Sequence, residues 1–203
     1  MGGCLEVIPS VQPDRRRVCG GTHVDVCVPE PSDYPFLIAL RNQEGVRRWF
    51  LDDRVIELAA GIEWLAARAC GHDDVLFLIR HRIRNINIGS IGWCHLDHDN
   101  GSVELGRLAL DSAALRRLVR SGEPRSVIRN LALDASLALR EHAFRHLGID
   151  TIRTCYKPDN IAAAEINRAC GMRICQAPEN SPANLVYLQL TRTEWERILL
   201  PTP

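Results

Sequence analysis

The chain has 203 residues with 46% hydrophobic content, which suits one folded domain with a sizeable core and argues against disorder. Lysine plus arginine and aspartate plus glutamate each total 25, so the formal net charge is +0. Proteins that bind nucleic acids or membrane surfaces usually carry a basic excess, so neither kind of partner is expected.

The first third of the chain predicts a tail, one short strand and two helical regions. Residues 1–22 mix glycine, proline, arginine and polar residues without periodicity, which is typical of a tail. Residues 24–28 favour a strand, and the prolines that follow mark a turn with Ser32 as a candidate N-cap. Helical spacing of apolar residues predicts a helical region interrupted near Gly45 and a second helix over 54–68.

The middle of the chain predicts three consecutive strands in an antiparallel meander. Residues 75–80 form a short apolar run, and residues 86–94 form a β-branched run. Asn100 and Gly101 then supply a hairpin signal, because both residue types tolerate positive φ. The partner strand is expected over residues 103–110.

The last part of the chain alternates helices and strands. After an arginine-rich connection, in which residues 113–119 favour one or two helical turns, the pattern predicts a helix over 125–147, a strand over 151–156, a helix over 161–170, and strands over 172–175 and 185–190. The full order predicts a mixed α/β fold with helices on the faces of one sheet. One domain is expected over 23–198, followed by a short C-terminal tail over 199–203.

Eight cysteines are scattered through the chain, and none forms a C-x-x-C pair. Structural zinc and a disulfide framework are therefore both disfavoured, and free thiols in a reducing compartment are the simpler interpretation. No apolar run approaches the ~18 residues of a membrane helix, and the N-terminus lacks the apolar segment of a signal peptide. These patterns favour a cytoplasmic protein with no membrane partner.

Short motifs in a consistent order extend over residues 24–190. They share their order and spacing with one known family, and they are Leu40-Arg41-Asn42, Val46 to Phe50, Ile88 to Gly92, Val103 to Arg107, Leu147-Gly148-Ile149, Asn160 with Ala163, and Gly171-Met172. Together they resemble the GNAT superfamily of N-acetyltransferases. Within it they are most similar to the branch that includes amino-sugar and, more distantly, ribosomal-protein N-acetyltransferases.

The resemblance implies a single-domain fold whose cofactor site uses many main-chain groups. In this family the fourth and fifth strands splay apart, and the pantetheine arm of acetyl-CoA, or of another acyl-CoA, lies between them as a surrogate strand. Leu108 and Leu110 are the matching main-chain positions. Asn160 matches an asparagine that contacts the pantetheine, and Ala163 would allow a close approach. A plain helix N-cap at Asn160 and an ordinary small residue at Ala163 explain the sequence equally well.

The resemblance also implies that the pyrophosphate lies at the N-terminus of the long helix, where free N–H groups and the helix dipole favour anions. The family pattern there is R/Q-x-x-G-x-G/A, but this chain has one glycine and an acidic residue between Arg120 and Ser126. Gly122, Arg125 and Ser126 are a candidate substitute cradle, in which the arginine supplies positive charge. The alternative is a basic, solvated loop before the helix.

Acylation of an amine requires a base for the amine proton and an acid for the departing thiolate. Glu104, on the expected fourth strand, matches the base of some family members, and its alternative role is a strand-edge carboxylate paired with Arg107 or another cation. Many relatives place a proton-donating tyrosine seven residues beyond the position of Asn160, but Asn167 stands there. Tyr156 is the substitute candidate, with a core aromatic role as the alternative.

Acceptor residues are implied by the opening helices, which help to frame the acceptor pocket in relatives. The matching side chains are Arg41, Asn42, Trp49 and Phe50. A metal site is not expected, although His95, Asp97, His98 and Asp99 gather near the hairpin. Consecutive strand residues alternate between faces, so these side chains are not expected to converge.

The leading functional hypothesis is transfer of an acetyl group from acetyl-CoA to the primary amine of a small molecule, such as an amino sugar or a biosynthetic intermediate. The enzyme would act as a monomer or homodimer. One alternative is acetylation of a protein N-terminus. Another is a non-catalytic GNAT-fold binding module, because the glycine signature and the tyrosine are both missing.

Overall fold

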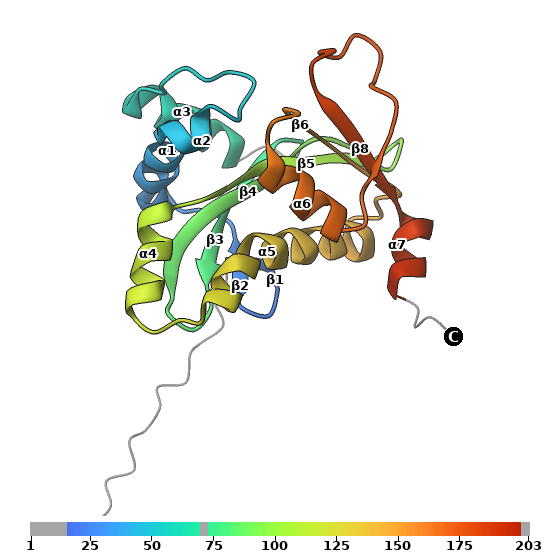
Figure 1. Ribbon diagram of the computed structural model, residues 1–203. Helices are drawn as coiled ribbons and strands as arrows, with labels where there is room; N and C mark the ends of the chain where they lie inside the picture. The colour runs from blue at the N-terminus through green and yellow to red at the C-terminus, as the bar shows by residue number, and fades with distance from the viewer. Residues whose placement is uncertain (1–15, 70–72, 200–203) are drawn as a thin grey trace, which may run out of the picture.

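The computed structural model describes residues 16–69 and 73–199. In this part of the chain, one sheet has the strand order β1-β2-β3-β4-β5-β6-β8-β7 (Figure 1). Neighbouring strands are antiparallel except β5 and β6, which are parallel. The strands are β1 (Arg17–Gly20), β2 (Val24–Cys27), β3 (Val75–His81), β4 (Ile86–Asp97), β5 (Ser102–Leu110), β6 (Thr151–Tyr156), β7 (Arg173–Ile174) and β8 (Val186–Thr191). The predicted mixed α/β sheet is confirmed.

Helices lie on both faces of this sheet (Figure 1). They are α1 (Tyr34–Asn42), α2 (Glu44–Arg47), α3 (Leu58–Ala69), α4 (Ser112–Arg120), α5 (Arg125–His146), α6 (Ile161–Ala169) and α7 (Arg192–Leu199), with a 3₁₀ turn at Pro31–Asp33. Side chains alternate along β3, so Phe77 and Ile79 join the core under α5 while Leu76 and Leu78 pack against α1 and α3. Helices α5 and α6 lie on the first of these two faces (Figure 1).

The long helix α5 agrees with its prediction at both ends. Leu131, Ala135 and Leu139 are fully buried, and their spacing of four residues places them on one face. The helix is followed by Gly148 with a φ of +69°, a conformation that favours glycine. The predicted stop is therefore confirmed, as is the β3–β5 meander with Gly101 in its hairpin turn at a φ of +57°.

Strands β5 and β6 separate after a short parallel contact. Their paired residues are Ser102 with Thr151, Val103 with Ile152, and Glu104 with Arg153. β5 continues to Leu110 and β6 to Tyr156, but the two strands form no further pairs with each other. The main chain of β5 beyond Glu104 therefore has no strand beside it on this side. The splayed strand pair that the family resemblance implies is present.

Strand β1 lies within residues 1–22, which the sequence pattern indicated to be a tail. β1 pairs antiparallel with β2, and a residue from α5 holds the turn between them. The Asp134 carboxylate accepts hydrogen bonds from the amides of Thr22, His23 and Val24 at 2.8, 2.7 and 3.1 Å. A four-residue strand has too little alternation to be detected by itself, so the tail assignment is corrected for Arg17–Gly20. Residues 1–15 lie outside the described part of the chain.

Three other local features differ from their predictions. Helix α3 begins at Leu58, four residues late, because Arg54 folds back onto the Asp52 carboxylate through its main-chain N–H (3.1 Å) and its guanidinium (2.7 Å). The helical region breaks at Gln43, so Gly45 lies inside α2. Helix α7 occupies residues for which the sequence pattern predicted no helix, and residues 200–203 of the expected C-terminal tail lie outside the described chain.

The turn into α1 also uses a different cap from the one expected. The Asp33 carboxylate accepts a hydrogen bond from the Glu30 amide at 3.0 Å, and Asn87 and Arg16 donate to the same carboxylate at 3.0 and 2.8 Å. Ser32 is therefore not the capping residue. An aspartate held by three donors from separate segments anchors this end of the helix to the sheet.

Candidate active site

A cavity of about 580 Å³ opens where β5 and β6 separate. Its walls come from α1, α2 and the residues after α2, from β5 and β6, and from α5 and α6. Most of the predicted site residues line this one cavity, and they are Arg41, Trp49, Phe50, Glu104, Leu108, Leu110, Tyr156, Asn160 and Ala163. Residues that lie more than a hundred positions apart in the chain thus share one site.

Four predicted site residues lie elsewhere. Asn42 holds the main chain of Ile56, donating to its carbonyl and accepting from its amide at 2.8 Å each, so its side chain is structural. Gly122, Arg125 and Ser126 lie at the start of α5, whereas the first α5 residue in the cavity wall is Ala132. At a rise of 1.5 Å per residue, Ala132 is roughly 10 Å further along the helix than Arg125. Gly122 has a φ of +85°, which accounts for the single glycine of this loop.

Glu104 is the last β5 residue paired with β6, and its side chain reaches the cavity. The Oε2 atom lies 3.4 Å from His95 Nδ1, and the Oε1 atom accepts a hydrogen bond from Cys155 Sγ at 3.8 Å. Arg107 is not its partner, because that guanidinium forms an ion pair with Asp74. The carboxylate therefore remains available for proton transfer, with a histidine beside it.

The side chains of Cys94, His95 and Glu104 converge at this point, a cluster that no sequence pattern predicted. The pairing of β4 with β5 shifts between Cys94 and Asp97, and His95 has a φ of +52°. This bulge turns His95 toward Glu104, so that ligand-type atoms of the three residues lie within 4.8 Å of one another. Structural zinc sites generally use four protein ligands, and the His95 side chain is 82% exposed. We interpret Cys94 and His95 as neighbours of the Glu104 carboxylate and not as a metal site.

The two cysteines beside Glu104 are not nucleophiles at neutral pH. Burial raises the pKa of the Cys155 thiol to about 12, with a further contribution from the Glu104 charge. Burial likewise raises the pKa of Cys94 to about 11. Because the thiolate is the reactive form, both side chains act as protonated, inert thiols.

Tyr156 and Asn160 also line the cavity. Tyr156 is the last residue of β6, and Asn160 is the N-cap of α6. No described residue is hydrogen-bonded to the Tyr156 hydroxyl, so this group is free to donate a proton into the cavity. The Asn160 side chain accepts a hydrogen bond from the Ala163 amide at 3.1 Å and thus caps α6. The side-chain NH₂ of Asn160 has no hydrogen-bond partner among the described residues and can donate a hydrogen bond to a ligand.

A stripe on α5 forms the floor of the cavity and was missed by sequence reasoning. Ala132, Ser136 and Arg140 recur at intervals of four residues, and all three line the cavity. Arg140 is only 4% exposed. One feature of the sequence could have revealed this stripe. Arg140 is adjacent to the buried Leu139 on the apolar side of a long helix, where a charged residue is rarely found without a partner.

Residues 28–173 match the family model described as the acetyltransferase (GNAT) domain. The chain belongs to the GNAT acetyltransferase family. This matched span contains the splayed strands, Glu104 and α6. No curated protein is similar enough in sequence to count as a match. Among the described helices, none combines the length and apolar character needed to cross a membrane.

Solved structures share the fold of this GNAT acetyltransferase at low sequence identity. A GNAT-family acetyltransferase from Chromobacterium violaceum has a TM-score of 0.68 and 17% identity, covering 91% of this chain and 96% of that one. A nucleotide-linked sugar GNAT protein has a TM-score of 0.68 and 14% identity, covering 88% and 92%. A ribosomal-protein alpha-N-acetyltransferase in complex with coenzyme A has a TM-score of 0.68 and 13% identity, covering 86% and 97%. At these identities the likeness concerns the fold alone.

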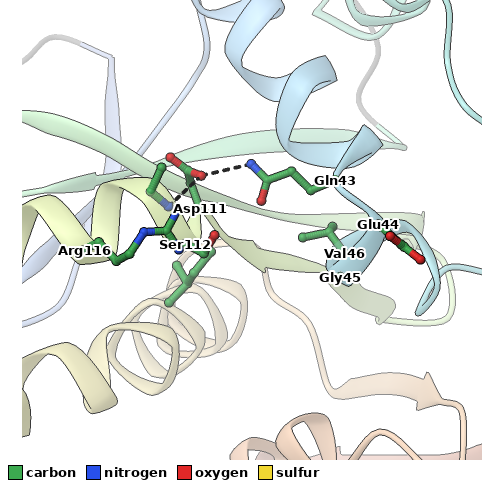
Figure 2. Close-up of a pocket in the computed structure, with 9 residues that line it drawn as sticks. Gln43, Glu44, Gly45, Val46, Asp111, Ser112 and Arg116 are labelled. Atoms are coloured by element: carbon green, nitrogen blue, oxygen red, sulfur yellow. Dashed lines mark hydrogen bonds between the residues drawn. The ribbon is translucent and has the colours of Figure 1, made fainter.

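A second hollow, of about 520 Å³, borders the larger cavity of this GNAT domain (Figure 2). It lies between α2 and the start of α4, and it shares Gly45, Val46 and Leu110 with the larger cavity. Gln43 and Asp111 face each other across it in Figure 2, with 2.9 Å between Nε2 and Oδ1. This contact fixes the helix pair α1–α2 to the end of β5.

We expect Asp111→Ala to lower the free energy of unfolding at pH 7 by about 1–3 kcal/mol, because it removes the N-cap of α4 and the bond from Gln43. Burial alone raises the pKa of Asp111, but hydrogen bonds from Gln43 and two amides lower it below its usual value of 3.8. The carboxylate therefore stabilises the fold above about pH 4, and this contribution is lost as the pH falls through the lowered pKa. Urea unfolding at pH 7 and pH 3 should show the difference between variant and parent shrinking at pH 3. An equal difference at both values would contradict the assignment.

Proposed function

We propose that this GNAT protein transfers the acyl group of an acyl-CoA to the primary amine of a small molecule. The observation that supports this most strongly is the end of β5–β6 pairing at Glu104, where the cavity opens. Main-chain N–H and C=O groups without a neighbouring strand pair readily with an extended, amide-containing chain. The pantetheine arm is such a chain, and Leu108 and Leu110 are the proposed main-chain partners.

Glu104 is the proposed general base and Tyr156 the proposed acid. Glu104 accepts a proton from the acceptor amine, directly or through one water, as the nitrogen attacks the thioester carbonyl carbon. The C–N bond forms, the C–S bond breaks, and the sulfur leaves with the bonding electron pair. Tyr156 then donates its hydroxyl proton to this thiolate and recovers a proton from solvent. The products are an amide and free CoA.

The phosphates of the donor are assigned to the start of α5. The first amides of α5 have no side-chain cap, since Pro124 occupies the N-cap position. Arg125 and Ser126 follow, and Gly122 allows the loop to turn back toward them. Asn160 and Ala163 are proposed to contact the pantetheine between this anchor and the reacting carbon.

A small amine fits the acceptor side better than an extended peptide. The cavity, at about 580 Å³, has the volume of a small-molecule site, and Arg41, Trp49 and Phe50 wall it from the α1–α2 side. The Arg41 guanidinium lies 4.0 Å from the centroid of the Phe50 ring and also donates a hydrogen bond to the Asp52 carbonyl. Arg41 therefore links α1 to the segment that follows α2. An amino sugar or a biosynthetic amine is the proposed acceptor class.

Titration calorimetry with acetyl-CoA tests whether the cavity is the donor site. We expect the parent protein to bind and Ala163→Trp to lose binding by at least about tenfold, because the indole would occupy the space proposed for pantetheine. Ala169→Trp is the matched control, since Ala169 is an exposed residue of the same helix. If the parent binds no acyl-CoA at millimolar concentration, the enzyme proposal fails and the binding-module alternative gains. Acylation of protein N-termini alone, with no reaction of an amine panel, would overturn the acceptor class.

A further inference from the structure

Arg140 is a buried cation without a carboxylate partner among the residues that the structure describes. Its Nη2 donates to Asn167 Oδ1 at 2.8 Å, its Nη1 donates to Cys170 Sγ at 3.1 Å, and its Nε has no hydrogen-bond partner. Burial raises the pKa of the Cys170 thiol above its usual value, so this neighbour carries no negative charge at neutral pH. Sulfur is a weak acceptor and the Asn167 oxygen is neutral. The positive charge of a 4%-exposed guanidinium is therefore left without an opposite charge.

Such an arrangement is unfavourable unless an anion compensates for the buried charge. A buried charge costs free energy unless an ion pair and hydrogen bonds compensate for the lost water, and arginine does not escape by losing its proton. The two carboxylates that share the cavity have other contacts, since Asp52 binds Arg54 and Glu104 lies beside His95. An anion supplied by a ligand would complete the site.

The position of Arg140 indicates which ligand brings that anion. Val103 and Leu105 join the core under α5, so Glu104 between them points to the other face of the sheet, toward α1 and α3. Arg140 and the other residues of its stripe approach from the α5 side. The acceptor amine meets Glu104 on one face, whereas the donor lies against α5 and α6 on the other. A group that reaches Arg140 therefore belongs to the donor.

We propose that Arg140 binds the distal carboxylate of a dicarboxylic acyl-CoA, such as a succinyl thioester, and so sets the donor class of this enzyme. The proposal rests on the acyl-transfer function above. The planar guanidinium offers a free Nε and remaining Nη hydrogens, which suit the two oxygens of a carboxylate. Ser136, one turn earlier on the same stripe, adds a hydroxyl to this floor. The distal carboxylate takes no part in bond making, and the amide product carries it unchanged.

Calorimetry with succinyl-CoA and butyryl-CoA isolates the charge, because the two four-carbon acyl chains differ mainly in their terminal group. We expect the parent protein to bind succinyl-CoA at least about tenfold more tightly than butyryl-CoA, as suits a desolvated, charge-assisted pair. In Arg140→Met this ratio should fall to one or below. Arg140→Lys keeps the positive charge but loses the planar guanidinium with its paired donors. This variant should retain part of the preference for succinyl-CoA over butyryl-CoA. Arg145→Met is the matched control, because Arg145 is an exposed residue of the same helix.

The thermal midpoint of the unliganded variants separates this role from a structural one. If Arg140 serves only to join α5 to α6, Arg140→Met should melt earlier and leave the donor ratio unchanged, which would overturn the proposal. Equal affinities of the parent for both thioesters would also overturn it, while leaving the acyl-transfer function intact. Failure to bind either thioester would instead refute that function. A loss of affinity in Arg140→Met confined to acidic amine acceptors would assign the anion to the acceptor and reject the donor assignment.

Discussion

Glu104→Gln is expected to lower kcat by about 10²–10⁴-fold, the range typical of a lost general base. The amide keeps the size of the side chain and its place beside His95 and Cys155, but it cannot accept the amine proton. Release of CoA thiol in steady-state assays measures the effect. Binding of acyl-CoA by calorimetry should change by less than about threefold, because the Glu104 side chain is proposed to act on the acceptor and not on the donor.

A second glutamate variant distinguishes the loss of the base from a nonspecific loss of one negative charge. Glu196→Gln is the control, since Glu196 is exposed on α7 and does not line the cavity. Unchanged turnover in Glu104→Gln would remove this residue from the mechanism.

Asp134→Ala is expected to lower the free energy of unfolding by roughly 2–4 kcal/mol, the largest stability effect we anticipate from one polar residue. Its carboxylate is the acceptor for three consecutive amides between β1 and β2, and truncation leaves those donors without a protein partner. Water can hydrogen-bond to the exposed Thr22 amide, so the expected loss of stability is smaller than the cost of leaving three buried donors unsatisfied. Urea unfolding followed by circular dichroism measures it.

Two comparisons make this prediction specific. Asp134→Asn keeps one acceptor oxygen and should lose about half as much stability as the alanine variant. Glu141→Ala removes an exposed acidic residue of the same helix, whose ion pair with Arg145 has both side chains about half exposed, and should cost less than about 1 kcal/mol. If all three variants unfold at the same urea concentration, Asp134 does not hold the β1–β2 turn.

The sequence was most informative where the interactions are local. The 3.6-residue apolar period predicted α5, the Asn100-Gly101 turn predicted the β4–β5 hairpin, and Asn160 was identified as a cap. Each depends on residues within a few positions of one another, so the pattern itself contains the physical cause. Motif order likewise identified the family that the comparison supports.

Contacts between distant segments decided the rest. His95, Asp97, His98 and Asp99 were not expected to converge with one another, but no sequence pattern indicated that a bulge against β5 brings His95 beside Glu104. Asn42 was expected in the acceptor pocket, but it holds Ile56, fourteen residues away. Bulges and side-chain clamps arise from pairing across the sheet, which no local period encodes.

The amino-acid sequence by itself determined the family and, apart from β1 and α7, most of the order of elements, and it proposed Glu104 as the candidate base. Only the tertiary structure decided where β5 and β6 part, that Arg140 is buried at the cavity floor, and that Asp134 holds the N-terminal strand in place. The physical reason is that hydrophobic periodicity and capping act over one or two turns. The burial of a charge or the end of a strand pair depends on which distant segments meet there.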